Sequence, residues 1–441
     1  MKYKTFFILF FNLTFSFPLI TIPFKRVFKY EKMTEENIME NLFYNDLEVN
    51  IEIGTPPKKY PLLIKLQEAA TYLMSIESDI ENIKKYNPKE SRTYLSKNEK
   101  LFRYIKLHCF NAMYIKDTFF FGNERVKGEL FYFILANNST EKMKSSGEIG
   151  LKFYEFGVKE ESTFLTQLFQ KKLILYPLFL LQYNDSNKNE GNLIVGSYPH
   201  EHNDKMYKKE DFIYSFIGRP DNTKWSILIT EVYSDYLLLD VNTEIQLFYE
   251  FGLIEGSERY YNTIYLKFFD DYLKKKICNK VMINNGSSYY YTECSNQFNY
   301  DDFPDIFFQS EGLNYTFNLT KDDLFMKYGN KIYFLIVFQL VPSNWGFGAI
   351  FFKKYQIYFD QEKKIYGLYK RKYNVTDTKN NKKLSFFTLS IILGVLLLLS
   401  VFIICYLYKI IKSKRKIRAN ELEDQYEYIS QTNKSSVQTI N

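Results

Sequence analysis

The chain has 441 residues, of which 46% are hydrophobic and 25% are charged, so it is too apolar to be disordered and long enough for two lobes. Its formal net charge of +7 is concentrated near one end, where lysines and arginines crowd residues 409–418. A nucleic-acid surface would spread such charge over a folded face, so we expect no nucleic-acid partner. The cluster suits the flank of a membrane span.

The first segment, residues 1–18, has the pattern of a signal peptide. Two lysines precede an apolar run over residues 6–17 that only single polar residues interrupt. This order is typical of secretory signals. No small-x-small cleavage pattern follows, which keeps an uncleaved anchor as an alternative. We expect residues 19–44 to be a prosegment or a linker.

Between about residues 45 and 370 the pattern is that of an all-β protein. Short runs of β-branched and aromatic residues alternate with clusters of Asn, Asp, Gly, Ser and Lys. Strands are predicted at residues 47–53, 114–122, 129–136, 236–249 and 356–369, with a polar turn at 240–243. Helices are predicted at residues 161–171 and 257–274.

Residues 384–408 contain no charged side chain. As a helix, about 25 residues extend roughly 37 Å, which is enough to cross a hydrocarbon core of about 30 Å with some tilt. Residues 371–383 then form a linker, and the basic segment places residues 409–441 on the cytoplasmic side. We therefore expect a single-pass type I membrane protein of the secretory or endosomal pathway or the cell surface, with a lumenal or extracellular ectodomain.

An extracytoplasmic location favours oxidised cysteines. Cys278 and Cys294 are expected to form a disulfide, Cys405 lies in the predicted span, and Cys109 is expected to be a buried apolar residue. Acceptor sequences for N-glycosylation are found at Asn137, Asn138, Asn184, Asn285, Asn314, Asn318 and Asn374. Asparagine is so abundant that we expect several of these to be accidental.

Short segments in a fixed order carry a family resemblance. In the first half they are 49–56 (VNIEIGTP), 86–94 (YNPKESRTY), 147–151 (GEIGL) and 190–197 (EGNLIVGS). In the second half they are 225–229 (WSILI), Cys294 with 303–308 (FPDIFF), and 345–360 (WGFGAIFFKKYQIYFD). Together they resemble the landmarks of pepsin-like aspartic proteases. The resemblance implies a bilobal, all-β acid-protease fold with lobes at residues 45–205 and 206–370, followed by one C-terminal transmembrane helix.

An active member of this family uses two carboxylates that share one proton, one from each lobe. The ionised carboxylate activates water and the protonated one polarises the peptide carbonyl. Each stands in an Asp-Thr/Ser-Gly motif, whose glycine permits a tight loop and whose hydroxyl locks the two loops together. This sequence contains neither Asp-Thr-Gly nor Asp-Ser-Gly.

Other residues stand at the positions of the two catalytic aspartates. Counting from the first hairpin places Lys65 at the first position, or Leu66 if the alignment slides by one residue. In the second lobe, counting back from the motif Leu-Ile-Glu-Gly places Phe248 there, with residues 240–243 as the turn before it. A competing register assigns Asp240 to this position. We favour Phe248, because Asp and Asn are also what a turn requires.

Two glutamates are the low-ranked substitutes for the missing aspartates. Glu68 and Glu250 lie in the two degenerate loops and would in principle serve as general acid and base. They stand two or three residues from the aspartate positions, and a displacement of even about 1 Å costs around 100-fold. The flap that covers the cleft in this family would fall near Tyr104, where the tyrosine is kept and the glycines are not.

Other chemistries leave no pattern in the sequence. His108, His200 and His202 have no metal-ligand spacing, and neither a nucleophile elbow nor a phosphate loop is present, so we expect no metal and no cofactor. Our hypothesis is a membrane-anchored homologue of pepsin-like aspartic proteases that lacks activity, a pseudoprotease, and binds a protein or peptide between its lobes. The alternatives are an active aspartic-type endopeptidase with non-standard carboxylates and a structural component of the surface or secretory pathway.

Overall fold

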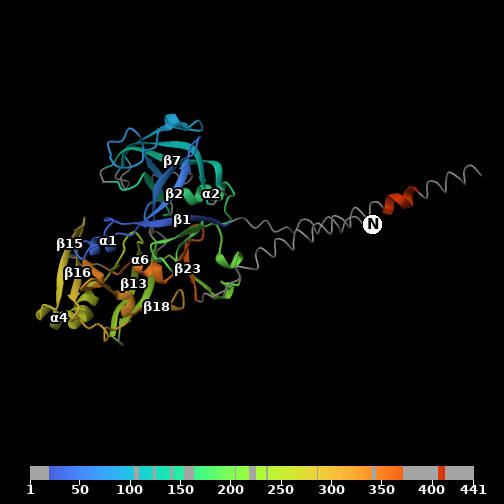
Figure 1. Cartoon of the computed structure of the whole chain (residues 1–441). Helices are drawn as coiled ribbons and strands as arrows, with labels where there is room; N and C mark the ends of the chain where they lie inside the picture. Colours follow the sequence, from blue (N-terminus) through green and yellow to red (C-terminus); the bar gives the residue numbers. More distant parts are fainter. Residues whose placement is uncertain are drawn as a thin grey trace, which may run out of the picture. The chain divides into compact units, whose positions relative to one another are not determined.

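Strands are the main regular structure of the chain and form two large sheets. The computed structural model describes residues 19–103, 109–122, 126–139, 143–152, 163–203, 205–217, 225–234, 237–285, 287–339, 344–370 and 406–412. The chain divides into two units, Met1–Tyr373 and Asn374–Asn441, and both sheets belong to the first unit (Figure 1). The described part of the second unit is a helical segment at residues 406–412.

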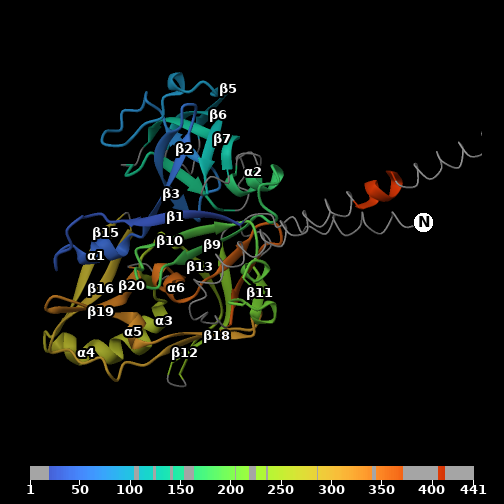
Figure 2. The ribbon, with the colours of Figure 1, turned by 45° about the vertical axis from the view of Figure 1, so that its right-hand side comes forward.

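The larger sheet joins strands from the two ends of the first unit. Its thirteen strands follow the order β11-β23-β22-β9-β10-β1-β2-β3-β8-β4-β7-β6-β5. Their bounds are β1 (Ile20–Val27), β2 (Asp46–Ile53), β3 (Lys58–Lys65), β4 (Tyr72–Met74), β5 (Leu95–Arg103), β6 (Cys109–Phe121), β7 (Val126–Ser139), β8 (Gly147–Gly150), β9 (Leu178–Tyr183), β10 (Glu190–Val195), β11 (Phe212–Phe216), β22 (Tyr358–Asp360) and β23 (Ile365–Tyr369). Strand β1 pairs antiparallel with both β10 and β2, and Figure 2 shows it between β3 and β10.

The smaller sheet belongs to the second half of the chain. Its path runs β15-β16-β20-β14-β21-β13-β12-β17-β18, and β19 pairs with β20 beside this path. The bounds are β12 (Ser226–Ser234), β13 (Leu237–Leu247), β14 (Ile254–Glu255), β15 (Cys278–Asn285), β16 (Ser287–Ser295), β17 (Ile306–Ser310), β18 (Tyr315–Leu319), β19 (Phe325–Tyr328), β20 (Lys331–Gln339) and β21 (Gly346–Phe347).

The helices of the first unit that the structure describes are short and lie in the connections between strands. They are α1 (Ile38–Phe43), α2 (Phe164–Gln170), α3 (Glu258–Tyr260), α4 (Leu266–Lys274), α5 (Lys321–Leu324) and α6 (Ala349–Lys354), with a π-helical turn, η5 (Tyr261–Tyr265), between α3 and α4. Single 3-10 turns are η1 (Pro88–Glu90), η3 (Pro199–Glu201) and η4 (Lys209–Asp211). Helix α3 begins where the side chain of Ser257 accepts the backbone N–H of Tyr260, which is a standard N-cap.

Large aromatic side chains fill the core where the two halves of the chain meet. Trp225 is fully buried, and its ring packs edge-on against Phe179 of β9 at 5.8 Å and Phe359 of β22 at 4.6 Å. The indole N–H of Trp225 donates to the backbone oxygen of Leu151. Residues from distant parts of the sequence thus share one apolar interior, and aromatic pairs of this kind stabilise a core beyond their buried area.

The structure confirms the all-β prediction and most of the predicted elements. The strands predicted in the first half correspond to β2, β6 and β7, and the predicted C-terminal strand corresponds to β22 and β23. The two predicted helices correspond to α2 and to the run from α3 to α4. Cys278 and Cys294 form the predicted disulfide, at facing positions of β15 and β16.

The prediction of a turn at residues 240–243 is wrong. Strand β12 ends at Ser234 and β13 begins at Leu237, so the connection between them precedes Asp240. Asn242 has a positive φ of 48° inside β13, a conformation that asparagine tolerates better than most residues. The polar residues at 240–243 belong to an irregular strand. Their local backbone preference does not distinguish such a strand from a turn, which is why a turn was predicted.

Residues 19–44, for which we predicted a prosegment or a linker, contain β1 and α1. Ile20, Ile22 and Phe24 of β1 are at most 3% exposed. Helix α1 packs its apolar side onto residues of the second half of the chain, among them Leu253 and Tyr333. The segment therefore contacts both halves of the chain and contributes to the core of each.

Several predictions concern residues outside the described part of the chain. These are the signal peptide at 1–18, Tyr104 with the flap around it, His108, and the predicted span at 384–408 apart from its last residues. Among the residues that the structure describes, no helix is long and apolar enough to cross a membrane.

Candidate functional site

Two strand ends, one in each half of the chain, occupy corresponding places in the fold. Strand β3 runs parallel to β8 with Ile64 opposite Ile149, and β13 runs parallel to β21 with Leu247 opposite Phe347. The next strand pairs antiparallel with β8 or β21 in each case: Tyr72 of β4 lies opposite Glu148, and Ile254 of β14 lies opposite Phe347. The same local topology thus occurs twice.

A glycine at each strand end lets the loop pass close to the sheet. A Cβ atom on Gly150 would lie 2.5 Å from the backbone oxygen of Glu68, and one on Gly348 would lie 2.2 Å from that of Phe251. Both approaches are too close for any side chain. Because Gly150 follows Ile149 and Gly348 follows Phe347, the loops at residues 65–70 and 248–253 are equivalent. Lys65 and Phe248 are then the corresponding residues.

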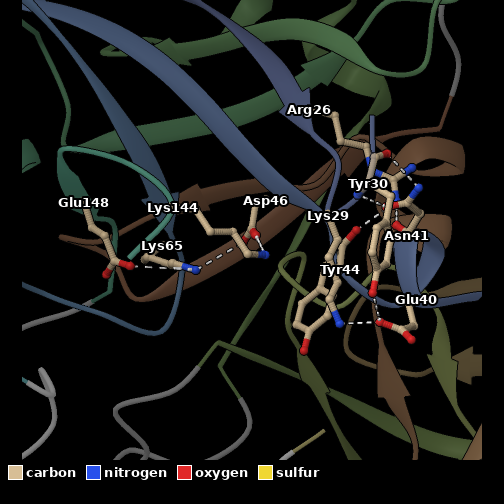
Figure 3. A network of polar contacts seen from close by, with 10 residues as sticks. All are labelled: Arg26, Lys29, Tyr30, Glu40, Asn41, Tyr44, Asp46, Lys65, Lys144 and Glu148. Carbon is tan, nitrogen blue, oxygen red and sulfur yellow. Dashed lines mark hydrogen bonds and ion pairs between the residues drawn. The ribbon is translucent and has the colours of Figure 1, made fainter. Parts of the chain in front are cut away.

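Lys65 lies in a network of charged side chains (Figure 3). Its Nζ atom is 3.4 Å from Oδ1 of Asp46 and 3.9 Å from Oε1 of Glu148. The second oxygen of Asp46 accepts a hydrogen bond from Nζ of Lys144 at 2.7 Å. Figure 3 shows these four residues together, with Lys65 between Glu148 and Asp46 and with Lys144 at the other oxygen of Asp46. We call them, together with Glu250, the Lys65 charge cluster.

Burial and neighbouring charges shift the pKa values of this cluster in opposite directions. Burial raises the pKa of Glu148 to about 7, and Lys65 only partly opposes this effect. Burial also acts to raise the pKa of Asp46, but Lys65 and Lys144 outweigh it and hold that pKa below its ordinary value. The pKa of Lys65 is raised, because Glu148, Asp46 and Glu250 outweigh the effect of burial. Lys65 is therefore a cation held by acids.

The two equivalent loops bond to each other through residues next to Lys65 and Phe248. The backbone N–H of Leu66 donates to Oε1 of Glu250 at 2.5 Å, and Nε2 of Gln67 donates to the backbone oxygen of Leu247 at 2.7 Å. The hydroxyl of Tyr249 donates to the backbone oxygen of Ile64. These bonds join the loops where, in the family that the sequence resembles, a motif hydroxyl does so.

The carboxyl group of Glu250 is enclosed in this junction. Burial raises its pKa, while Lys65 and backbone N–H groups oppose the rise. Its second oxygen, Oε2, is buried and has no hydrogen-bond partner among the described residues. The backbone oxygen of Glu68, the other predicted substitute, accepts a hydrogen bond from the backbone N–H of Lys152 at 2.8 Å. The Glu250 carboxylate therefore joins the loops as an acceptor.

Phe248 and Asp240 have different surroundings. The backbone N–H of Phe248 donates to the oxygen of Phe347, and its ring covers Gly346. Asp240 lies within β13, where its Oδ2 atom accepts the indole N–H of Trp345 at 2.9 Å and the hydroxyl of Ser257 at 2.7 Å. Asp240 thus anchors a core tryptophan and the start of α3.

His200 and His202 serve as hydrogen-bond partners. Nδ1 of His200 lies 2.5 Å from the hydroxyl of Tyr369, and Nε2 of His202 contacts the hydroxyl of Ser197. Within the described ranges, no group of three or more His, Cys, Asp or Glu side chains is arranged to hold a metal ion.

Asp46, Lys144 and Glu148 were not predicted from the sequence. Glu148 left one usable signal, because it stands in the segment GEIGL where the resembled family has an apolar residue. A glutamate there, together with a lysine at the first aspartate position, is a pair of complementary charges. Asp46 and Lys144 left no comparable signal, since charged residues are common near strand ends.

Comparison with known families places most of the chain in one group. Residues 48–370 match the family model described as eukaryotic aspartyl protease. The match includes both equivalent loops and the strands that carry them. The comparison with curated protein sequences returns no match.

Proposed function

Because the chain belongs to the eukaryotic aspartyl protease family, we propose that it is a catalytically inactive member, a pseudoprotease, that binds a protein or peptide ligand. The proposed location is a lumenal or extracellular ectodomain on a single transmembrane helix at residues 384–408. No cofactor is needed for this role.

The observation that carries the proposal is the position of Lys65. Proton sharing requires two carboxyl groups in contact, one ionised and one protonated. At the end of β3, where the first of them would stand, the side chain is an ammonium group within 4 Å of Asp46 and Glu148. A cation here favours ionised neighbours and therefore opposes the shared proton.

The second loop supports the same proposal. Phe248, the residue that corresponds to Lys65, has a side chain with no acid-base chemistry. The nearby Glu250 uses one carboxylate oxygen to accept the N–H of Leu66. A carboxylate that fastens the two loops in this way is not positioned to activate a water molecule.

A proteolysis assay tests the inactivity. The purified ectodomain, residues 19–373, is incubated with a diverse peptide library from pH 3 to pH 8, and cleavage is followed by mass spectrometry. We expect no cleavage above that of a buffer control, whereas an active member of the family in parallel cleaves the library. Cleavage that the ectodomain carries out at any of these pH values contradicts the proposal.

The alternative is an active endopeptidase with non-standard carboxylates, and one observation favours it. Glu148 has a pKa of about 7 and Glu250 has a raised pKa, and raised values of this kind suit a general acid. If cleavage is found, the variants E148Q, E250Q and E68Q decide the case. Loss of cleavage in any of them, with unchanged thermal stability, supports this alternative.

A binding assay separates the pseudoprotease from a purely structural component. Random peptides displayed on phage are panned on the immobilised ectodomain, and we expect a consensus sequence to be enriched. Phe248→Ala is expected to weaken the binding of the selected peptide at least tenfold. Leu237→Ala, an exposed position on β13, is the matched control and should leave it unchanged. Failure to enrich any consensus favours the structural role.

A further inference from the structure

Two glycosylation acceptor sequences lie at the two ends of one edge strand. Asn314-Tyr-Thr begins immediately before β18, and Asn318-Leu-Thr begins inside it. Strand β18 is the terminal strand of the smaller sheet and pairs with β17. The two asparagines are close in sequence, but the fold treats them differently.

Asn314 is at the tip of the turn between β17 and β18. Its side chain is exposed, as is that of Thr316, the hydroxyl residue of the same acceptor sequence. The backbone N–H of Asn314 donates to the oxygen of Glu311 at 2.9 Å, and the residue has a positive φ of 47°. The turn is thus closed by backbone atoms and presents the asparagine side chain to solvent.

Asn318 is held by a buried tyrosine. The hydroxyl of Tyr355 lies 2.9 Å from Oδ1 and 3.0 Å from the backbone oxygen of Asn318, and it accepts the backbone N–H of the same residue at 2.9 Å. Tyr355 is 8% exposed. The hydroxyl of Thr320, which completes this acceptor sequence, is bonded to Asp323 at the start of α5. The amide of Asn318 is thus held against Tyr355, and the hydroxyl that its acceptor sequence needs is engaged by Asp323.

We propose that Asn314 carries an N-linked glycan and that Asn318 does not. In the transfer, the side-chain nitrogen of Asn314 forms a bond to C1 of a sugar carried on a polyprenyl diphosphate. The bond between C1 and the phosphate oxygen breaks, the amide loses one proton, and polyprenyl diphosphate leaves. The inference rests on the proposed lumenal location, since N-glycosylation acts on chains that enter the secretory pathway.

The glycan has a physical consequence for the sheet. A terminal strand offers unpaired backbone groups to other chains, and proteins cover such edges to avoid association. Tyr355 already occupies the N–H and the oxygen of Asn318. A sugar on Asn314 covers the other end of β18, so the two features together protect the edge.

The experiment uses the full chain expressed in a eukaryotic secretory host. Glycans are released with an amidase that converts each glycosylated asparagine to aspartate, and the peptides are analysed by mass spectrometry. We expect aspartate at position 314 and asparagine at position 318. Thr316→Ala should lose one glycan, and Thr316→Ser, which keeps the acceptor sequence, should retain it.

The variant N318Q supplies an independent measurement. It should leave the glycan mass unchanged and lower the midpoint of thermal unfolding, because the Oδ1 contact to Tyr355 is disturbed. A glycan on Asn318, or an unmodified Asn314 in a chain glycosylated at another position such as Asn184, overturns the inference. A chain without any glycan overturns both the inference and the proposed location.

Discussion

At the end of β3, Lys65 faces acids from different parts of the chain: Asp46 in β2, Glu148 in β8 and Glu250 in the opposite loop. Its side chain is 20% exposed. Groups this far from water depend on their partners, and removing one charge leaves the others without compensation. The cluster is therefore sensitive to single substitutions and to pH.

Replacing Lys65 with methionine should destabilise the ectodomain. The variant keeps the side-chain volume but leaves Glu148 and Glu250 without their cation, so we expect a loss of about 2–3 kcal/mol in the free energy of unfolding at pH 7. Urea unfolding followed by tryptophan fluorescence measures it. Lys58→Met is the control, because the Lys58–Glu90 pair is exposed and such pairs contribute at most about 1 kcal/mol. Equal effects of the two substitutions would contradict the assigned role of Lys65.

The stability of the ectodomain should rise as the pH falls from about 7 towards 4.5. The folded state raises the pKa of Glu148 from 4.5 to about 7, so it binds this proton more tightly than the unfolded chain does. The gain is on the order of 3 kcal/mol and is complete below pH 4.5. Asp46 acts in the opposite sense, because its pKa is lowered from 3.8, and its contribution is lost in stronger acid.

Urea unfolding at pH 5 and pH 8 measures this dependence. The variant E148Q removes the titrating group and should reduce the difference between the two pH values. A wild-type chain that is more stable at pH 8 than at pH 5 would show that the assigned direction is incorrect.

At the scale of the element, β1 determines how the sheet is joined. Six residues of β1 pair with β10, and four pair with β2. Arg26 at its end donates to the backbone oxygens of Asn41 at 2.6 Å and Tyr44 at 2.8 Å, which ties the strand to α1 (Figure 3). Residues 19–44 are thus bonded into the fold through β1 and α1.

A chain that begins at Asn45 should fail to fold cooperatively, whereas one that begins at Leu19 should fold. Removing β1 exposes the edges of β2 and β10 together with the apolar surface that Ile20, Ile22 and Phe24 cover. Circular dichroism during heating distinguishes the two chains. N-terminal sequencing of the protein from its natural source should then find residues 19–44 retained. A stable, cooperative chain from Asn45 would mean that β1 is dispensable.

The sequence was sufficient to predict the types of element and insufficient to predict the contacts between the two halves of the chain. Alternation of apolar and polar residues predicted strands such as β2 and β7, because the pattern is local. It did not predict β1, because ITIPFKRV follows an apolar segment that resembles a leader. In addition, no local pattern identifies β2 and β10 as the pairing partners of β1. The polar residues at 240–243 were misinterpreted for a related reason: a strand that tolerates a positive φ has the composition of a turn.

In the candidate site, too, some features were predictable from the sequence and others were not. Lys65 and Phe248 were predicted by counting along the chain, and the strand registers make them equivalent. The ion pair between Lys65 and Asp46 depends on how β2 and β3 align side chains across the sheet, which no local pattern specifies. The hydrogen bond from Leu66 to Glu250 joins residues 184 positions apart.

At the scale of the molecule, the first unit holds both sheets, and its last strand, β23, ends at Tyr369. Strand β23 pairs with β22 and β11, and β22 pairs with β9. All the described strands of this unit thus precede the proposed transmembrane span.

A chain that ends at Tyr373 should therefore be secreted as a folded, soluble ectodomain, and the full chain should remain with the membranes. Fractionation of the expressing cells and their medium measures this difference, with cooperative unfolding as the check on folding. A full chain that remains soluble after high-speed centrifugation would rule out the proposed anchor.

The pairing of β22 with β9 also has a consequence for synthesis. Leu180 of β9 pairs with Tyr358, which lies 178 residues later in the chain, and pairing over such separations is slow. Until the ribosome has released residues 358–360, the apolar strand LFLLQY keeps an open edge that other chains can join. Premature termination anywhere between these strands would leave an aggregation-prone product. Correct folding of the sheet therefore depends on the strands that are translated last.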